Sequence, residues 1–469
     1  MNAMNALLES LQGTVAQNNG GVAIKDASKL RTRMDGLVYE AVFGDGETKA
    51  AARWLIWEIA QALGNRPASI HELYIARGQG AIDRVFTTPA INLRMLTYDS
   101  ACAAFRAAKK VDAGSFIFEI ARSEIGYTDQ RPSEYASVIL AAAVKEGHRG
   151  PVFIQGDHFQ VNAKRFAEAP EAELKAVRDL TAEAISAGFY NIDIDTSTLV
   201  DLSKPTVYEQ QRANFEHCAD LTRTVRELQP QGVTISVGGE IGEVGGKNST
   251  EEEMRAYMDG YIASLHGLTG ISKISIQTGT SHGGVVLADG TLADVAIDFD
   301  VLKHLADVGR NEYGIGGTVQ HGASTLPESA FGKFVEAGAV EVHLATAFQT
   351  LVFGHEAVPQ SLRDEMRDWL YRNAMNERKP KDTDEQFIYK TRKKAIGPFK
   401  QTFWNLPKET RSAIGASLEA RFTFLFQQLA IGDTAHYVSE HIHPVEIHQP
   451  MPTGAVKAVK AESVEGLAD

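Results

Sequence analysis

Acidic and imidazole side chains follow buried apolar runs at several points of this 469-residue chain. Asp157 and His158 end the apolar start of "IQGDHFQVN", and Glu240 ends "VTISVGGE". Two further histidines, His282 in "TGTSHGG" and His321 in "VQHGAS", follow later apolar runs. Neutral imidazoles suit Zn²⁺ or a similar divalent ion and can leave a coordination position open for substrate. The pattern therefore predicts a metal centre.

The carboxylate beside the first histidine predicts proton transfer next to that metal. Adjacent residues at a strand end point in different directions, so Asp157 can face the substrate while His158 binds the ion. Carbon–carbon bond chemistry needs such a base near a hydroxyl whose carbonyl partner is polarised by the ion. Hydrolysis with a bound water would use the same residues, so the ligands alone leave the reaction open.

Small residues after two of the histidines suggest an anion site. Gly283 and Gly322 allow a backbone N–H to approach a ligand closely, and Ser324 lies nearby. Successive amides in such turns can form a nest for a phosphate, although glycine also marks ordinary strand-to-loop turns. A Schiff-base mechanism would require a lysine near the same place. Lys273 begins its apolar run and is expected at the opposite end, which favours a metal over an imine.

The elements that must position these residues alternate regularly. Eight short apolar, β-branched runs are separated by amphipathic helical stretches, which predicts a (β/α)8 TIM barrel in the α/β class. The site residues follow the runs, as expected for the carboxyl-terminal mouth of a barrel. A doubly wound sheet is the alternative, but no G-x-G-x-x-G follows the first run. The runs begin at residues 90, 114, 151, 191, 233, 271, 314 and 339.

The flanking sequence predicts helical additions to the barrel. We expect an N-terminal helical extension over 1–87, a catalytic barrel over 88–350, a C-terminal helical extension over 351–445 and a flexible tail over 446–469. The stretch "ETKAAARWLIWEIAQALG" has its tryptophans at helical spacings, which we interpret as packing.

Composition restricts the function classes. A net charge of -13 with pI near 5.6 disfavours nucleic acid or an anionic membrane as partner. Two cysteines predict no disulfide framework and a reducing compartment. The N-terminus lacks the pattern of a signal peptide and no run approaches the length of a membrane span, so we expect a cytoplasmic protein.

The ordered motifs resemble the class II, metal-dependent fructose-bisphosphate and tagatose-bisphosphate aldolases, as a divergent long member. The resemblance covers roughly two thirds of the chain. It is carried by "TPAINLRMLTYDSACAAFRAA", "GDH", "GGEIGEVGG", "GTSHGG", "QHGAS", "AVEVHLAT" and "YKTRKKAIGPFKQTFWNL".

The resemblance implies roles for these residues. Asp157 matches the acid/base residue that handles the C4 hydroxyl proton, and Glu240 resembles a glutamate that can hold a second or displaced ion. His158, His282 and His321 match the three ligands of a catalytic metal, usually Zn²⁺. The implied reaction joins or cleaves dihydroxyacetone phosphate and an aldehyde through a metal-stabilised enediolate. The residues expected to bind substrate or phosphate are Gly283, Gly322, Ser324, His343, Thr346 and Asn92.

Three departures from the family pattern concern the substrate. His343 stands where the family usually has asparagine, and Gly238 stands where a first glutamate is expected. A lysine often found after the second metal histidine is absent from "HGGVVLADG".

These observations leave three hypotheses. The first is a zinc-dependent aldolase acting on a ketose phosphate, and the second is a metal-dependent sugar or sugar-phosphate epimerase using the same site. The third is a non-catalytic partner subunit of a tagatose-bisphosphate aldolase, which the intact set of acid and histidines argues against. The resemblance also implies a homo-oligomer, either a dimer or a tetramer.

Overall fold

A closed parallel barrel forms the centre of the molecule. The computed structural model describes residues 2–18, 20–242, 247–279, 287, 297–455 and 464–467. Within this part of the chain, eight strands pair in sequence order, and β11 pairs with β4 to close the barrel. The predicted (β/α)8 fold is therefore confirmed. The strands are β4 (Thr88–Asn92), β5 (Ile117–Ala121), β6 (Val152–Gln160), β7 (Asn191–Asp195), β8 (Ser236–Glu240), β9 (Lys273–Ser275), β10 (Thr318–Gln320) and β11 (Glu341–Leu344).

Helices cover the outside of the barrel. Several have sequence signals at their ends: Thr250 and Glu253 form a capping box, and Gly147 ends a helix in the left-handed region with φ 66°. These signals fix where each helix stops and the next strand begins. The helices between strands are α6 (Thr97–Val111), α7 (Arg122–Thr128), α8 (Pro132–Glu146), α9 (Ala163–Glu168), α10 (Pro170–Ser186), α11 (Val207–Leu228), α12 (Glu251–Leu265), α13 (Phe299–Tyr313) and α14 (Phe331–Glu336).

The N-terminal region contains strands as well as the predicted helices. An antiparallel hairpin of β1 (Val15–Asn18) and β2 (Gly21–Ile24) follows α1 (Ala3–Ser10). The short β3 (Pro67–Ala68) pairs with the start of β6, so this part of the region belongs to the barrel base. Helices α3 and α4 pack against α8. The remaining helices are α2 (Ala27–Arg31), α3 (Met34–Phe43), α4 (Gly46–Leu63) and α5 (His71–Gly78).

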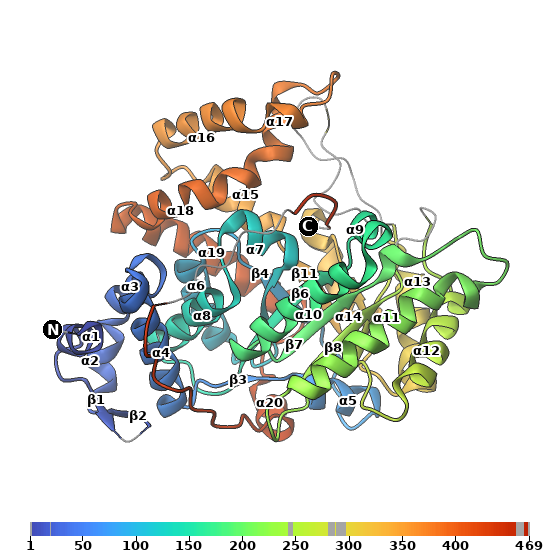
Figure 1. Ribbon diagram of the computed structural model, residues 1–469, viewed down its shortest axis with the longest axis horizontal. Coiled ribbons are helices and arrows are strands. Elements are labelled where there is room, and N and C mark those ends of the chain that lie inside the picture. Colours follow the sequence, from blue (N-terminus) through green and yellow to red (C-terminus); the bar gives the residue numbers. More distant parts are fainter. Residues whose placement is uncertain are drawn as a thin grey trace.

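The C-terminal helices lie at both ends of the barrel. In Figure 1, α15 to α18 form the layer at the top, on the side where β6 ends, while α5 and α20 lie at the bottom. The long α19 packs against α6 on the outside of the barrel. These helices are α15 (Thr346–Gly354), α16 (Gln360–Asn373), α17 (Asp384–Thr391), α18 (Ile396–Trp404), α19 (Lys408–Gln428) and α20 (Ala435–His441).

Residues 447–449, at the start of the predicted flexible tail over 446–469, contact α4, and the flexibility of the tail stays a prediction. The indole N–H of Trp54 donates to the carbonyl of Gln449 at 2.8 Å, and that of Trp57 donates to the carbonyl of Ile447 at 2.6 Å. The backbone N–H of Ile447 donates to the side chain of Gln61 at 3.0 Å. The tail sequence has few apolar residues, but α4 supplies buried polar partners for its backbone.

One continuous apolar core joins the barrel to both sets of additional helices. It includes Leu55 and Ile59 of α4, the barrel strands, and Phe422 and Phe426 of α19. The predicted domain boundaries stay predictions, because the extensions share this core with the barrel. None of the helices in the described residues is both long and apolar enough to span a membrane.

Candidate active site

A bulge at the end of β6 positions the two residues that carry most of the site. The pairing of β6 with β7 shifts register between Gly156 and Phe159, so Asp157 and His158 share the place of one ladder residue. His158 has a φ of 39°, in the left-handed region. A Cβ on Gly156 would lie 2.5 Å from the ring of Phe159, so this tight bend needs glycine.

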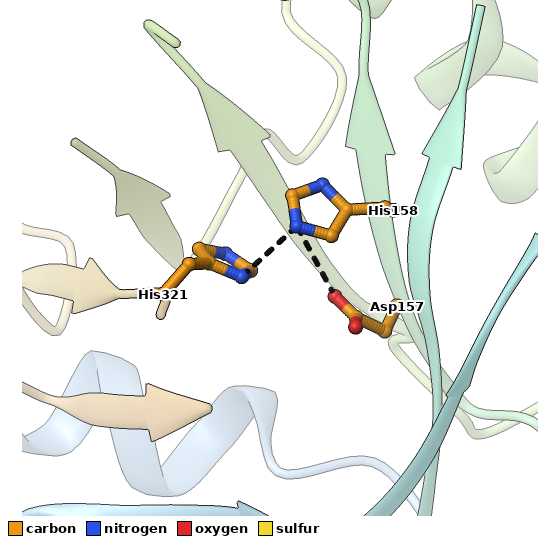
Figure 2. A group of neighbouring side chains, drawn as sticks. All are labelled: Asp157, His158 and His321. Carbon is orange, nitrogen blue, oxygen red and sulfur yellow. Dashed lines mark hydrogen bonds and ion pairs between the residues drawn. The ribbon is translucent and has the colours of Figure 1, made fainter. Parts of the chain in front are cut away.

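Because of the bulge, the side chains of Asp157 and His158 lie on the same side of the sheet, which differs from the expected opposite directions. Strict alternation would direct Asp157 and His158 to opposite faces of the sheet. Instead, a carboxylate oxygen of Asp157 lies 3.8 Å from Nε2 of His158, and both side chains are buried. Both therefore face the inside of the barrel (Figure 2).

His158 is surrounded by potential ligands on both ring nitrogens. Its Nε2 lies 3.0 Å from Nδ1 of His321, which follows β10 on the other side of the site (Figure 2). Its Nδ1 lies 3.2 Å from a carboxylate oxygen of Asp195 and 3.2 Å from one of Glu240. The hydroxyl of Ser275 lies 2.8 Å from Nε2 of His321. Strands β6, β7, β8, β9 and β10 thus converge on one cluster.

This arrangement fits a divalent metal ion. If Nδ1 of His158 donates to Asp195 or Glu240, its Nε2 lone pair faces His321, as in the carboxylate–histidine–metal arrangement. Two imidazole nitrogens 3.0 Å apart need a proton or a cation between them. Ligand atoms of Asp157, His158 and His321 lie within 4.8 Å of one another, as do those of His158, Asp195 and Glu240. Nitrogen and oxygen donors of this kind suit Zn²⁺ and similar ions.

The carboxylates around His158 set the local electrostatics. Burial alone would lower the pKa of His158, but Asp157 and Glu240 raise it well above its ordinary value. Burial, reinforced by the negative charge of Asp195, raises the pKa of Glu240 to about 7. The site therefore concentrates negative charge in a buried space, which favours binding of a cation.

His343 adds a third imidazole to the site, beside His321. Its Nδ1 lies 3.2 Å from a carboxylate oxygen of Asp157 and 3.0 Å from one of Glu119. Its Nε2 lies 2.7 Å from Glu341, and its ring centroid lies 4.0 Å from that of His321. Burial would lower the pKa of His343, but Glu119 and Asp157 raise it well above its ordinary value. Carboxylates of Asp157, Glu119 and Glu341 thus lie around the ring of His343.

Lys273 is part of a buried ionic network beneath the site. It lies at the start of β9, as predicted, and it is fully buried. Its ammonium group contacts a carboxylate oxygen of Asp193 at 2.9 Å, the amide oxygen of Gln155 at 2.7 Å, and Glu341. Burial lowers the pKa of Lys273, and the two carboxylates raise it more. A lysine held charged by ion pairs is unsuited to Schiff-base formation, which needs the neutral amine.

The same network explains the departure at Gly238. A Cβ at this position would lie 2.3 Å from Asp193 and 3.0 Å from Lys273. The Asp193–Lys273 pair thus occupies the space that any side chain at position 238 would need.

The other predicted residues are distributed around the cluster. Asn92 donates to Glu124 at 2.6 Å, in a separate buried network with Arg94. Ser324 accepts a hydrogen bond from the backbone N–H of Ala345 at 2.6 Å. Neither of these hydrogen bonds joins Asn92 or Ser324 to the cluster of Asp157 and His158.

Two further predicted residues, Gly322 and Thr346, lie in segments that follow barrel strands. Gly322 has a φ of 70° and begins the turn after β10, and Thr346 begins α15. Both positions follow barrel strands at the same end of the barrel as the cluster. His282 and Gly283 lie outside the described residues.

Sequence reasoning missed four acidic residues of the site, among them Glu341 of "AVEVHLAT", which contacts His343. Asp193 and Asp195 lie two apart in "NIDIDTS", so the period of a strand places them on one face. Glu119 interrupts the apolar run "FIFEIA", where a buried carboxylate needs a partner. These two signals, read together with the histidines, would have identified Asp193, Asp195 and Glu119.

Comparison with known protein families gives one match that covers the barrel. A family model described as "Fructose-bisphosphate aldolase class-II" matches residues 79–400. Since this match covers more than half of the chain, the protein belongs to the class II fructose-bisphosphate aldolase family. Curated protein sequences give no significant match.

Solved structures share the fold at low sequence identity. The native fructuronate-tagaturonate epimerase UxaE from Cohnella laeviribosi is 12% identical, with a TM-score of 0.55 and 90% of each chain covered. The fructose-bisphosphate aldolase of Campylobacter jejuni is 17% identical over 78% of this chain and 94% of its own, with a TM-score of 0.47. The likeness to the epimerase structure supports the fold of this protein and no more specific property.

Proposed function

We propose that this protein is a metal-dependent lyase that cleaves or forms a ketose phosphate or bisphosphate, with dihydroxyacetone phosphate and an aldehyde as the fragments. The observation that carries the proposal is the buried carboxylate of Asp157 beside the paired nitrogens of His158 and His321. Family membership supports the reaction class.

The residues that would hold the metal are His158 and His321, with His282 expected from the sequence. Glu240 and Asp195 contact Nδ1 of His158, so they orient this ligand or bind a displaced ion. We propose Zn²⁺ as the ion. When bound, it supplies a Lewis acid that polarises the ketose carbonyl.

Asp157 would act as the base. Its carboxylate accepts the proton of the C4 hydroxyl, the C3–C4 bond breaks, and C4 becomes the aldehyde carbon. The electron pair of the broken bond moves toward the ketose carbonyl, and in synthesis Asp157 returns the proton. His343 lies 3.2 Å from Asp157 and stabilises the ionised carboxylate in this position.

Substrate phosphate would bind around the turn after β10. Gly322 and Ser324 lie there, and the left-handed Gly322 leaves room for a ligand near the backbone. Thr346 lies at the first turn of α15, where helix amides favour an anion.

A metal-dependent sugar or sugar-phosphate epimerase is the second candidate. The observation that favours it is the contact between Asp157 and His343, which gives the site two groups able to exchange a proton with substrate. Epimerisation could use the same bond cleavage followed by addition to the other face of the retained aldehyde.

One assay separates the two candidates. The zinc-loaded protein is incubated with fructose 1,6-bisphosphate, tagatose 1,6-bisphosphate and unphosphorylated ketoses, and triose and epimer formation are followed separately. Triose formation that depends on metal and on Asp157 is the expected result. Epimers without trioses would overturn the lyase proposal in favour of the epimerase.

The resemblance to the family also supports a homo-oligomer, either a dimer or a tetramer, located in the cytoplasm. Light scattering coupled to size-exclusion chromatography measures the assembly directly.

A further inference from the structure

A basic cavity lies at the end of the barrel opposite the candidate active site. It has a volume of about 450 Å³ and lies between α5, α13 and the turn from α14 to β11. Because Gly338 of this turn precedes β11, the cavity belongs to the amino-terminal ends of the strands. Four cations line it, Arg77, Arg84, Lys303 and Arg310, together with one acidic residue, Glu336. Two of the four, Lys303 and Arg310, also pair with Asp307 at 2.8 Å each, so Arg77 and Arg84 carry the excess charge. This excess is unusual for a protein of net charge -13.

Arg77 is the most informative residue of this cavity. Its side chain is only 8% exposed, yet no carboxylate among the described residues forms an ion pair with it. Among the described residues, its one hydrogen bond is a long contact of 3.5 Å from Nη1 to the carbonyl of Val340. The guanidinium also lies 4.5 Å over the ring of Phe86. Most of its N–H donors are therefore left for the cavity.

The positions of Arg77 and Arg310 at helix ends explain why cations occur here, but they do not supply hydrogen-bond acceptors for the guanidinium groups. Arg77 and Arg310 lie in the last turns of α5 and α13, where the helix dipole favours a cation. Arg310 is partly used, because it donates to Gly338 at 2.7 Å and to Asp307 at 2.8 Å. In the part of the chain that the structure describes, Arg84 donates only to the carbonyl of Ala430, at 3.1 Å. A buried charge without an anionic partner is costly, so an anion in this cavity would be strongly favoured.

Burial does not neutralise the guanidinium group of Arg77 at physiological pH. Burial, with a contribution from the nearby charge of Arg310, lowers the pKa of Arg77 to about 10. The guanidinium thus keeps its charge near neutral pH. The like charges of Arg77 and Arg310, which both line the cavity, repel each other, and a bound anion would relieve this repulsion.

We propose that this cavity, which we call the basal cavity, binds the phosphoryl group of a small phosphorylated metabolite. Its arginines come from different elements and offer donors in several planes, which suits a tetrahedral oxyanion more than a planar carboxylate. The site is separate from the catalytic one and does not depend on the proposed reaction.

Calorimetric titration of the full-length protein with pyrophosphate and with inorganic phosphate, at constant ionic strength, tests this assignment. Arg77→Gln and Arg84→Gln should each weaken binding about tenfold or more, because each removes a charge-assisted contact. Arg367→Gln is the matched control, since Arg367 is 49% exposed on α16 and pairs with Asp364. Arg84 is partly exposed, so its variant remains informative if the Arg77 variant does not fold.

Two further measurements separate this site from the catalytic one. Binding at the basal cavity should persist in His158→Ala, and citrate should bind more weakly than pyrophosphate. Affinities that are equal in the wild type and both arginine variants would overturn the proposal. So would complete loss of binding in His158→Ala, or tighter binding of citrate than of pyrophosphate.

Discussion

Asp157 lies between two imidazoles that have different neighbours. On one side, His158 contacts Asp195 and Glu240, which leaves its other nitrogen directed at His321. On the other side, His343 contacts Asp157 and Glu119. We therefore expect the two imidazoles to have distinct roles, with His158 as a ligand of the proposed metal ion and His343 as a partner of the Asp157 carboxylate.

Replacing the base should separate chemistry from metal binding. We expect Asp157→Asn to retain bound zinc and to lose about 10²- to 10⁴-fold in kcat, the usual contribution of general base catalysis. His158→Ala and His321→Ala should instead lose the metal, as measured by elemental analysis of the purified variants. Full metal content in both histidine variants would contradict the proposed coordination.

Chelation gives a complementary test of the same ligands. Treatment with a metal chelator should abolish turnover, and stoichiometric Zn²⁺ should restore it. Metal affinity should also fall as the pH falls, because the imidazoles bind the ion only when neutral. Activity that survives exhaustive metal removal would contradict a metal-dependent mechanism.

A histidine outside the site should make the fold sensitive to acid. His71 is 5% exposed, and burial, with a contribution from Arg226, lowers its pKa to about 4. The native state keeps this imidazole neutral while the unfolded chain takes up a proton below about pH 6.5, so stability falls as the pH decreases from 6.5 toward 4. The loss approaches about 3 kcal/mol at the acid end of this range.

Urea unfolding between pH 7 and pH 4.5 measures this effect. His71→Leu should show a smaller decrease in the free energy of unfolding than the wild type. The exposed His436 on α20 provides the matched histidine-to-leucine control, because it lies outside the buried core. Equal slopes for wild type and His71→Leu would show that His71 does not determine the acid sensitivity.

At the scale of the elements, the inside of the barrel combines a bulged strand with a buried ionic network. The bulge in β6 directs Asp157 and His158 to one side, while β7, β9 and β11 contribute Asp193, Lys273 and Glu341 beneath them. Burial of ion pairs is costly unless every partner is satisfied, so this layer tolerates little change in volume.

A substitution at Gly238 measures how little added volume this buried ionic layer accepts. A Cβ added there would displace Asp193 from Lys273, so Gly238→Ala should lower the free energy of unfolding by about 2–4 kcal/mol. Gly36 on α3 is the control, because a Cβ there meets nothing within 4 Å. Chemical denaturation of both variants gives the comparison, and equal stabilities would contradict the packing argument.

The elements also show what a sequence can predict here. The eight strands follow from apolar runs, and three of the site residues with described positions, Asp157, His158 and His321, follow from the ends of those runs. The bulge could not be predicted, because register is set by pairing with β7 and not by the sequence of β6 alone. The contact between His343 and Asp157 depends on that same bulge.

At the scale of the whole molecule, residues far apart in sequence complete each other's polar contacts. Glu58 of α4 is 1% exposed, and its carboxylate accepts hydrogen bonds from the backbone of Gln449 at 2.9 Å and contacts His448 at 2.6 Å. Composition predicted a loose tail in this region, because the partners of its polar groups lie about four hundred residues away.

Removing this segment should expose α4. A chain ending at Val445 should lose about 2–4 kcal/mol of stability, since several buried groups lose their hydrogen bonds. Its tryptophan emission should also shift to longer wavelength, as Trp54 and Trp57 gain contact with water. The same truncation with both tryptophans replaced by Phe should show no such shift, and an unchanged spectrum in the truncated parent would contradict the docking.

The docking of residues 447–449 on α4 also has a consequence for biosynthesis. The hydrogen-bond acceptor of the Trp57 indole, the carbonyl of Ile447, lies 390 residues further along the chain. During translation, α4 therefore leaves the ribosome long before this acceptor has been synthesised. Nascent chains therefore carry an incompletely satisfied helix until synthesis is nearly finished. The native arrangement of the N-terminal region can be reached only as a late step, when translation has delivered that distant segment.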